Sequence, residues 1–176
     1  MSTLRIPVGS HDHVTGNPEA SIVLVEYGDY QCPWCGQAFP VVQRLLARHG
    51  RDVAFAFRHF PLTEAHPEAY NAAVVAEYAG AQGHFWQAHR ALFENQDALG
   101  PELYAELIQS LGLDVTGLQQ ALDTDAFDAR IRNDMEGGIR SGVNGTPSFF
   151  LNGQRFDTGD DFGTLLDAVE QLLQSR

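Results

Sequence analysis

The feature that most constrains this chain is a pair of cysteines placed between a predicted strand and a predicted helix. Cys32 and Cys35 are the only cysteines in 176 residues. An apolar run over 21–27, rich in β-branched residues, precedes them and predicts a strand buried on both faces. Helical spacing follows over 33–50, and the run 53–57 predicts a second strand. A strand, a helix and a strand within about 40 residues form a βαβ unit, which requires parallel strands and a right-handed crossover.

The rest of the chain predicts a block of helices and then a second strand-rich segment. Stretches with helical spacing occupy 71–78, 85–93, 103–111, 118–122 and 127–139. Short apolar runs at 148–151 and 154–157 flank Asn152-Gly153, which predicts a hairpin because this dipeptide tolerates positive φ. A last amphipathic stretch, 162–173, predicts a C-terminal helix. Strands therefore come from both ends of the chain and should share one core.

Charge and composition narrow the classes of partner and of chemistry. The chain carries 11 basic and 23 acidic residues, a formal net charge of −12, and every basic residue is arginine. So acidic a surface repels phosphate backbones, which makes nucleic acid and anionic membranes poor candidate partners. The absence of lysine excludes P-loop, Schiff-base and pyridoxal phosphate chemistry. Two cysteines are too few for a disulfide-stapled scaffold or a zinc ribbon.

Targeting and membrane segments are not evident. No run approaches the ~20 apolar residues of a membrane span, and the first residues lack the apolar stretch of a signal peptide. We therefore expect no membrane span and, for the chain as it stands, a cytoplasmic location. A chain from which a leader had been removed would look the same and would be periplasmic or extracytoplasmic, so that alternative stays open.

The position of the two cysteines favours redox chemistry. A cysteine at a helix N-terminus faces unpaired backbone N–H groups and the positive end of the helix dipole, and both favour thiolate. Pro33 suits the first helical position, where no N–H is needed. We expect Cys32 to be exposed and nucleophilic, and Cys35 to be the shielded thiol that resolves a mixed disulfide. The alternatives are a pair of inert core cysteines or half of a metal site.

Two segments carry a resemblance to a known family. They are VEYGDYQCPWC at 25–35 and GTPSFFLNG at 145–153. Both resemble the DsbA-like branch of the thioredoxin fold, and RHFPL at 58–62 and QGHFW at 82–86 are similar to segments of compact bacterial DsbA-like proteins. Similar domains also occur attached to ion antiporters.

The resemblance implies an α/β, thioredoxin-like fold, with a mixed central sheet flanked by helices. The thioredoxin-like domain would comprise 1–62 and 141–176, and an inserted helical domain would occupy 63–140. The implied function is thiol–disulfide exchange with protein substrates, with no bound cofactor, no metal, and a redox partner that recycles the cysteine pair.

Roles for individual residues follow from the same resemblance. Pro147 would be a cis-proline facing the disulfide, and Thr146 would offer its backbone to an extended substrate segment. Trp34 and Pro33, between the cysteines, would also contact substrate. Glu26 falls where this fold keeps a buried acid, and a desolvated carboxyl has a raised pKa and can move the proton of the second cysteine. The alternative for Glu26 is an exposed strand residue.

The dipeptide between the cysteines leaves the direction of exchange open. Strongly oxidising members of the family have a histidine next to the second cysteine, where this chain has Trp34. Without that histidine the thiolate is less stable and the disulfide less oxidising. Oxidase and reductase both remain possible, as does a redox-sensing module that regulates a partner such as a transporter. A metal site made from both thiolates and a histidine is a third alternative.

Other polar residues are interpreted more simply. The first 20 residues show little periodicity, and His11-Asp12-His13 predicts a solvated turn rather than a metal site. His89 shares an apolar face with Phe85 and predicts a core histidine, whereas His59 is a weaker candidate for the active site. Several acidic residues predict a solvated helix face, because the spacing of a calcium loop is missing: Asp123, Asp125, Asp128, Asp134 and Glu136.

Overall fold

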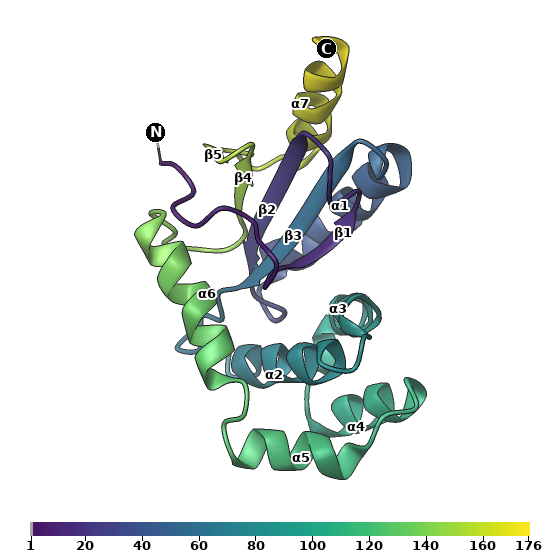
Figure 1. The fold of residues 1–176 in the computed structure, drawn as a ribbon. Coiled ribbons are helices and arrows are strands. Elements are labelled where there is room, and N and C mark those ends of the chain that lie inside the picture. Colours follow the sequence, from purple (N-terminus) through teal and green to yellow (C-terminus); the bar gives the residue numbers. More distant parts are fainter. Residues whose placement is uncertain (1) are drawn as a thin grey trace.

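The computed structural model describes residues 2–176, which form a five-stranded mixed sheet with helices around it (Figure 1). The strand order is β1-β3-β2-β4-β5. The strands are β1 (His13–Gly16), β2 (Ile22–Gly28), β3 (Val53–His59), β4 (Ser148–Leu151) and β5 (Gln154–Phe156). β2 and β3 are parallel, and the other neighbouring pairs are antiparallel. The central strand β2 is thus paired with β3 on one side and, on the other, with a strand from the far end of the chain.

The predicted βαβ unit is present, with α1 (Pro33–His49) joining β2 to β3. Leu24 of β2 lies opposite Phe55 of β3, and both strands are almost entirely buried because helices cover the two faces of the sheet. α1 ends where the sequence predicts, and its C-cap residue Gly50 donates its N–H to the Leu46 carbonyl. This unit fixes the place where β2 passes into α1.

Helices cover both faces of the sheet, α1 and α7 (Gly163–Gln174) on one face and α6 (Asp128–Arg140) on the other. α1 and α7 share one core, to which Leu45 and Leu165 contribute. The residues of β2 that point the other way, such as Val25, form a second core against which Met135 of α6 packs. The sheet is therefore the middle layer of three.

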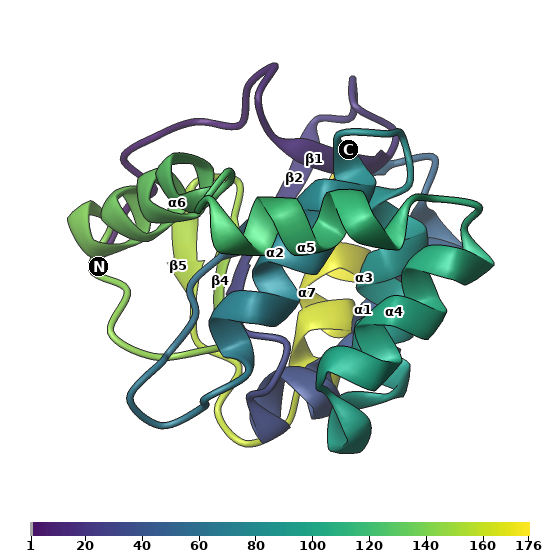
Figure 2. The same cartoon turned by 90° about the horizontal axis from the view of Figure 1, so that it is seen from below.

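The remaining helices close one end of the sheet. They are α2 (Ala69–Gly80), α3 (Phe85–Glu94), the 3-10 helix η1 (Gln96–Ala98), α4 (Pro101–Ser110) and α5 (Val115–Asp123). Figures 1 and 2 show α2 and α3 next to the sheet and α4 and α5 farther out. The division into a thioredoxin-like domain and an inserted domain at 63–140 stays a prediction. Within residues 2–176, no helix combines the length and the apolar character that a membrane crossing needs.

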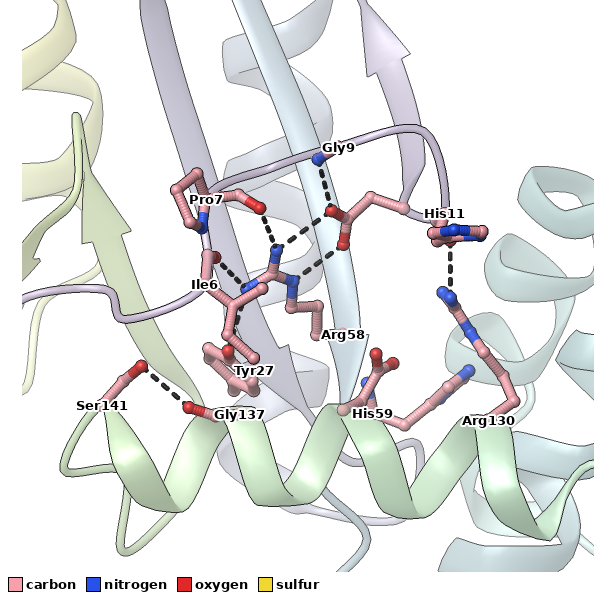
Figure 3. A network of polar contacts seen from close by, with 12 residues as sticks. Ile6, Pro7, Gly9, His11, Tyr27, Arg58, His59, Arg130, Gly137 and Ser141 are labelled. Atoms are coloured by element: carbon pink, nitrogen blue, oxygen red, sulfur yellow. Dashed lines mark hydrogen bonds and ion pairs between the residues drawn. The ribbon is translucent and has the colours of Figure 1, made fainter.

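β1 was not predicted, because its four residues, three half-buried and one exposed, are too few to show an alternating pattern. It pairs with the outer edge of β3, and Arg58 of β3 holds the segment that precedes it (Figure 3). The Arg58 guanidinium donates to both Asp12 carboxylate oxygens, at 2.7 and 3.0 Å, and to the Ile6 carbonyl at 2.8 Å. It also donates to the Tyr27 hydroxyl at 3.0 Å.

Two predictions about polar residues are wrong. The turn at His11-Asp12-His13 is not simply solvated, because Asp12 pairs with Arg58 and the His13 ring stacks on Phe85 at 3.7 Å between centroids. Asp134 does not belong to a solvated helix face, since it is buried and accepts the backbone N–H of His59 at 2.9 Å. In both places a carboxylate binds a group from a distant segment, and a local sequence pattern cannot show such a contact.

Candidate functional site

Cys32 and Cys35 lie at the junction of β2 and α1, and both are free thiols in this structure. Cys32 is the N-cap residue of α1, with Pro33 at the start of the helix, as the sequence predicts. The N–H of Cys32 donates to the Asp29 carbonyl at 3.1 Å. Because no side chain within residues 2–176 caps this helix, the first-turn N–H groups are left to interact with the sulfur of Cys32.

The two thiols have opposite acidities. Hydrogen bonding from the Cys35 side chain is the main cause that lowers the pKa of Cys32 to about 5, although burial acts against it. Bonds from the backbone N–H groups of Cys35 and Trp34 also lower it. Burial raises the pKa of Cys35 well above its ordinary value. At neutral pH the pair therefore holds one thiolate and one thiol.

The expectation that Cys32 is exposed is wrong. Cys32 is only 3% exposed and Cys35 is fully buried, whereas Trp34 between them is 49% exposed. The Cys32 sulfur lies 3.5 Å from the carbonyl oxygen of Thr146, on the loop before β4. That loop lies 114 residues farther along the chain, so the local pattern at the start of α1 could not reveal the cover.

The loop that covers Cys32 contains the predicted cis-proline. The peptide bond between Thr146 and Pro147 is cis. A groove of about 490 Å³ lies beside it, lined by Trp34, Thr146 and Pro147 together with Phe156 and residues of the loop that follows β5. Of the predicted substrate contacts, Trp34 and Thr146 line this groove, while the exposed Pro33 does not.

Glu26 lies in β2 on the same face of the sheet as α1, and it is buried rather than exposed on a strand edge. Its Oε1 atom has no hydrogen-bond partner within residues 2–176. Burial, with a smaller contribution from the Cys32 thiolate, raises the pKa of Glu26 to about 8. The carboxyl also contributes to the raised pKa of Cys35. A carboxyl with this pKa can take up and return a proton near neutral pH.

Asp29, which no sequence pattern singled out, organises the turn before α1. Its two carboxylate oxygens accept the N–H groups of Gln31 at 2.8 Å and Leu62 at 2.9 Å. The second oxygen also contacts His66 Nδ1 at 2.8 Å. In the sequence, Gly28-Asp29 was interpreted only as the end of a strand. An aspartate directly before such a turn is a recognisable signal, because its side chain often accepts backbone N–H groups two residues on.

The two histidine candidates lie in the packed interior. His89 is a core histidine as predicted: its Nδ1 is hydrogen-bonded to the Tyr30 hydroxyl at 2.9 Å, and burial lowers the pKa of His89 to about 3. His59 contacts Glu77 at 3.1 Å, and no hydrogen bond within residues 2–176 joins it to either cysteine. The same part of the chain contains no group of three or more His, Cys, Asp or Glu side chains that could hold a metal ion.

The family model described as a DSBA-like thioredoxin domain matches residues 23–170. The chain belongs to this family. Oxidised BdbD from Bacillus subtilis superposes with a TM-score of 0.84 over 98% of each chain at 24% identity. A thioredoxin-like oxidoreductase from Silicibacter pomeroyi DSS-3 gives 0.80 over 94% of each chain at 28% identity. The predicted α/β, thioredoxin-like fold of this DsbA-like chain is confirmed, and the fold supports thiol–disulfide oxidoreductase activity in general.

Relatives of the DsbA-like chain also occur as parts of longer proteins. Na(+)/H(+) antiporter NhaA 1 of Mycobacterium sp. (strain KMS) is 39% identical over 172 residues, which are 96% of this chain and 28% of that protein. NhaA 1 of Salinispora arenicola (strain CNS-205) is 42% identical over 167 residues, 94% of this chain and 26% of that protein. The chain spans about a quarter of the length of these relatives.

Proposed function

We propose that this DsbA-like chain exchanges disulfides with protein substrates through Cys32 and Cys35, without a bound cofactor. The observation that carries the proposal is the arrangement of the two sulfurs. One lies at the N-terminus of α1 under hydrogen bonds that favour thiolate, and the other is buried in the first turn, near the Glu26 carboxyl. The groove beside Trp34 and Thr146 would hold the extended segment that carries the substrate disulfide.

The reaction begins with attack of the Cys32 thiolate on one sulfur of the substrate disulfide. A Cys32–substrate bond forms as the substrate bond breaks, and one substrate sulfur leaves as thiolate. Glu26 in its carboxylate form accepts the proton of Cys35, and the Cys35 thiolate then attacks the Cys32 sulfur. This closes the Cys32–Cys35 disulfide and releases the second substrate thiolate. Two electrons pass from the protein to the substrate, and the reverse sequence oxidises a substrate dithiol.

The acidity of Cys32 supports an intermediate oxidising strength. Its pKa of about 5 lies between the ~7 of thioredoxin and the ~3.5 of DsbA. A more stable thiolate favours the reduced form and makes the disulfide a stronger oxidant. We therefore propose a reduction potential between roughly −270 mV and −120 mV, the values for thioredoxin and DsbA. The compartment stays a prediction.

A trapping experiment tests this function. Reduced protein is mixed with a disulfide-containing peptide, and adducts are separated under non-reducing conditions. Cys35→Ser should accumulate a mixed disulfide, because Cys32 still attacks while the resolving step is lost. Cys32→Ser should form no adduct and exchange nothing. Equal trapping by both variants, or trapping through Cys35 alone, would overturn the assignment of the nucleophile.

The matched pair of variants also serves as its own folding control. Both substitutions replace one buried sulfur by oxygen in the same turn, so far-UV circular dichroism and melting should be similar. Alkylation of the reduced wild type at pH 6 should label Cys32 much faster than Cys35, because the thiolate is the reacting form.

A second candidate function is favoured by one observation, the antiporter names of the relatives that contain this region. In that case the domain would be a redox-sensing module whose disulfide state regulates a transporter. Repeated turnover separates the two functions. An enzyme should pass many equivalents of disulfide in the presence of glutathione, whereas a sensor should change state once and cycle poorly.

A further inference from the structure

Gln96 connects the helical block to the redox site. It lies in η1, between α3 and α4, more than 60 residues after the cysteines in sequence. Its side-chain Nε2 donates to the Tyr30 carbonyl at 2.9 Å and to the Cys32 carbonyl at 2.8 Å. Both hydrogens of the amide nitrogen are therefore used on the short turn that leads into α1.

Gly36, the residue after the second cysteine, makes room for this side chain. A Cβ atom built on Gly36 would have Gln96 atoms as its three nearest neighbours, including Cδ at 3.0 Å and Nε2 at 3.1 Å, with Oε1 closer still. Gly36 also donates its N–H to the Cys32 carbonyl at 3.0 Å, the first hydrogen bond of α1. The amide of Gln96 and the backbone of Gly36 thus meet on the same carbonyl oxygen.

The contact of Gln96 holds the turn whose backbone N–H groups stabilise the Cys32 thiolate. The backbone N–H groups of Trp34 and Cys35 that bond the Cys32 sulfur belong to the turn whose carbonyls Gln96 holds. A donor on the Cys32 carbonyl also offsets partial negative charge close to that sulfur. Loss of the donor would remove the link between the Tyr30 and Cys32 carbonyls and so loosen the turn.

We propose that Gln96 is a positioning residue for the redox pair, and that through it the helical block sets the acidity of Cys32. This rests on the proposed function of the two cysteines. Gln96→Ala should raise the Cys32 pKa and shift the equilibrium with glutathione toward the protein disulfide. The acid dissociation constant of Cys32 and the equilibrium constant with glutathione should each change roughly threefold to tenfold, the size expected from one net hydrogen bond. Gln109→Ala, at an exposed glutamine of α4, is the control and should change neither quantity.

A double-variant experiment tests the contact itself. Gly36→Ala in the wild type should push Gln96 away, raise the Cys32 pKa and lower the stability. In the Gln96→Ala background the same substitution should raise the stability, because the obstacle is gone and alanine is the better helix former. This reversal of sign is the expected result. Additive effects of the two substitutions would overturn the proposal.

The readouts separate this proposal from the proposed function. The Cys32 pKa is measured by the pH dependence of iodoacetamide labelling, which needs no substrate, and so it decides the role of Gln96 even if exchange with proteins is absent. A Gln96→Ala protein that melts earlier but keeps its Cys32 pKa and glutathione equilibrium would make Gln96 merely structural and would overturn the proposal. If Gln96→Ala does not fold, Gln96→Met replaces it, since methionine has a similar length, carries no charge and has no donor.

Discussion

Two glutamates of this molecule are buried to nearly the same depth, but their pKa values are shifted in opposite directions. Glu26 in β2 is 3% exposed and Glu77 in α2 is 5% exposed. Glu26 Oε1 has no partner within residues 2–176, and burial raises the pKa of Glu26 to about 8. Burial also acts to raise the pKa of Glu77, but hydrogen bonds from His13 and His59 outweigh it and bring that pKa well below its ordinary value.

The surroundings of Glu77 explain this difference. Its carboxylate lies 2.6 Å from His13 Nε2, 3.1 Å from His59 Nε2 and 2.9 Å from Arg130 Nε. These partners come from β1, β3 and α6, so the carboxylate links three elements to α2, and Figure 3 shows His59 and Arg130 side by side above α6. Partners, not depth, decide whether a buried carboxyl is a fixed charge or a mobile proton. A paired carboxylate such as Glu77 holds elements together, whereas an unpaired carboxyl such as Glu26 can take part in proton transfer.

The largest expected effect is on stability, when the negative charge of Glu77 is removed from its basic partners. Glu77→Ala should lower the free energy of unfolding by roughly 3–5 kcal/mol at pH 7, because it removes the carboxylate that pairs with the buried His59 and the half-buried His13 and Arg130. Urea denaturation measures this. Glu94→Ala, which removes an exposed ion pair with Arg90, should cost less than about 0.5 kcal/mol. Similar losses in the two variants would refute a special role for the buried cluster.

Glu26→Gln should slow the resolving step because Cys35 loses the group that takes its proton. General acid–base groups contribute about 10²–10⁴-fold, so we expect at least a hundredfold longer lifetime of the mixed disulfide at pH 7. Rapid quenching followed by non-reducing separation measures that lifetime. The initial attack by Cys32 should change far less, and equal slowing of both steps would contradict the assignment.

The pH dependence of stability should also differ between the two glutamates. Between the ordinary pKa of 4.5 and about 8, folded Glu26 keeps a proton that the unfolded chain has lost. Stability therefore falls as pH rises through this window, by about 1.4 kcal/mol per pH unit relative to Glu26→Gln. Unfolding of both proteins in a Cys32→Ser background measures the slope without the thiolate. Parallel curves would show that Glu26 is solvated.

Glu77 should show the opposite dependence. Its pKa is lowered in the folded state, so its contribution is complete above the ordinary value and is lost as pH falls through the folded pKa. The difference between wild type and Glu77→Ala should therefore shrink only in acid, where the difference between wild type and Glu26→Gln is smallest.

The smallest expected effect is on the pKa of Cys32, when a histidine, the kind of partner that Glu77 has, is placed beside it. A nearby imidazolium stabilises a thiolate and so lowers the pKa of the thiol. Trp34→His should therefore bring the Cys32 pKa below about 5, toward the ~3.5 of DsbA. The position is half exposed, and solvent will weaken the effect. Iodoacetamide labelling against pH measures it, with Trp34→Phe as the control. A pKa that rises or stays constant in Trp34→His would show that the dipeptide does not set the acidity.

The sequence predicted those parts of the molecule that depend on neighbouring residues. The strand before the cysteines, α1, the hairpin of β4 and β5 and the cis bond at Pro147 all follow from short segments or from the family pattern. β1 was missed because it is short: it pairs with β3, and Arg58 holds the segment before it through Asp12, so its own residues carry no periodic pattern. The burial of Cys32 and the contact of Gln96 were missed because their partners lie 114 and 64 residues away. Such partners leave no local pattern.

The place of β2 in the sheet has a consequence for how the chain reaches its final form. β2 pairs with β3 nearby in sequence, but its other edge pairs with β4, where Leu24 lies opposite Leu151. During synthesis on the ribosome, that apolar edge has no neighbour until most of the chain has emerged, while the intervening helices form from local contacts. An unpaired edge of this kind is prone to intermolecular pairing. Chains interrupted before β4 should therefore aggregate, and slow translation between α2 and α6 should prolong their exposure.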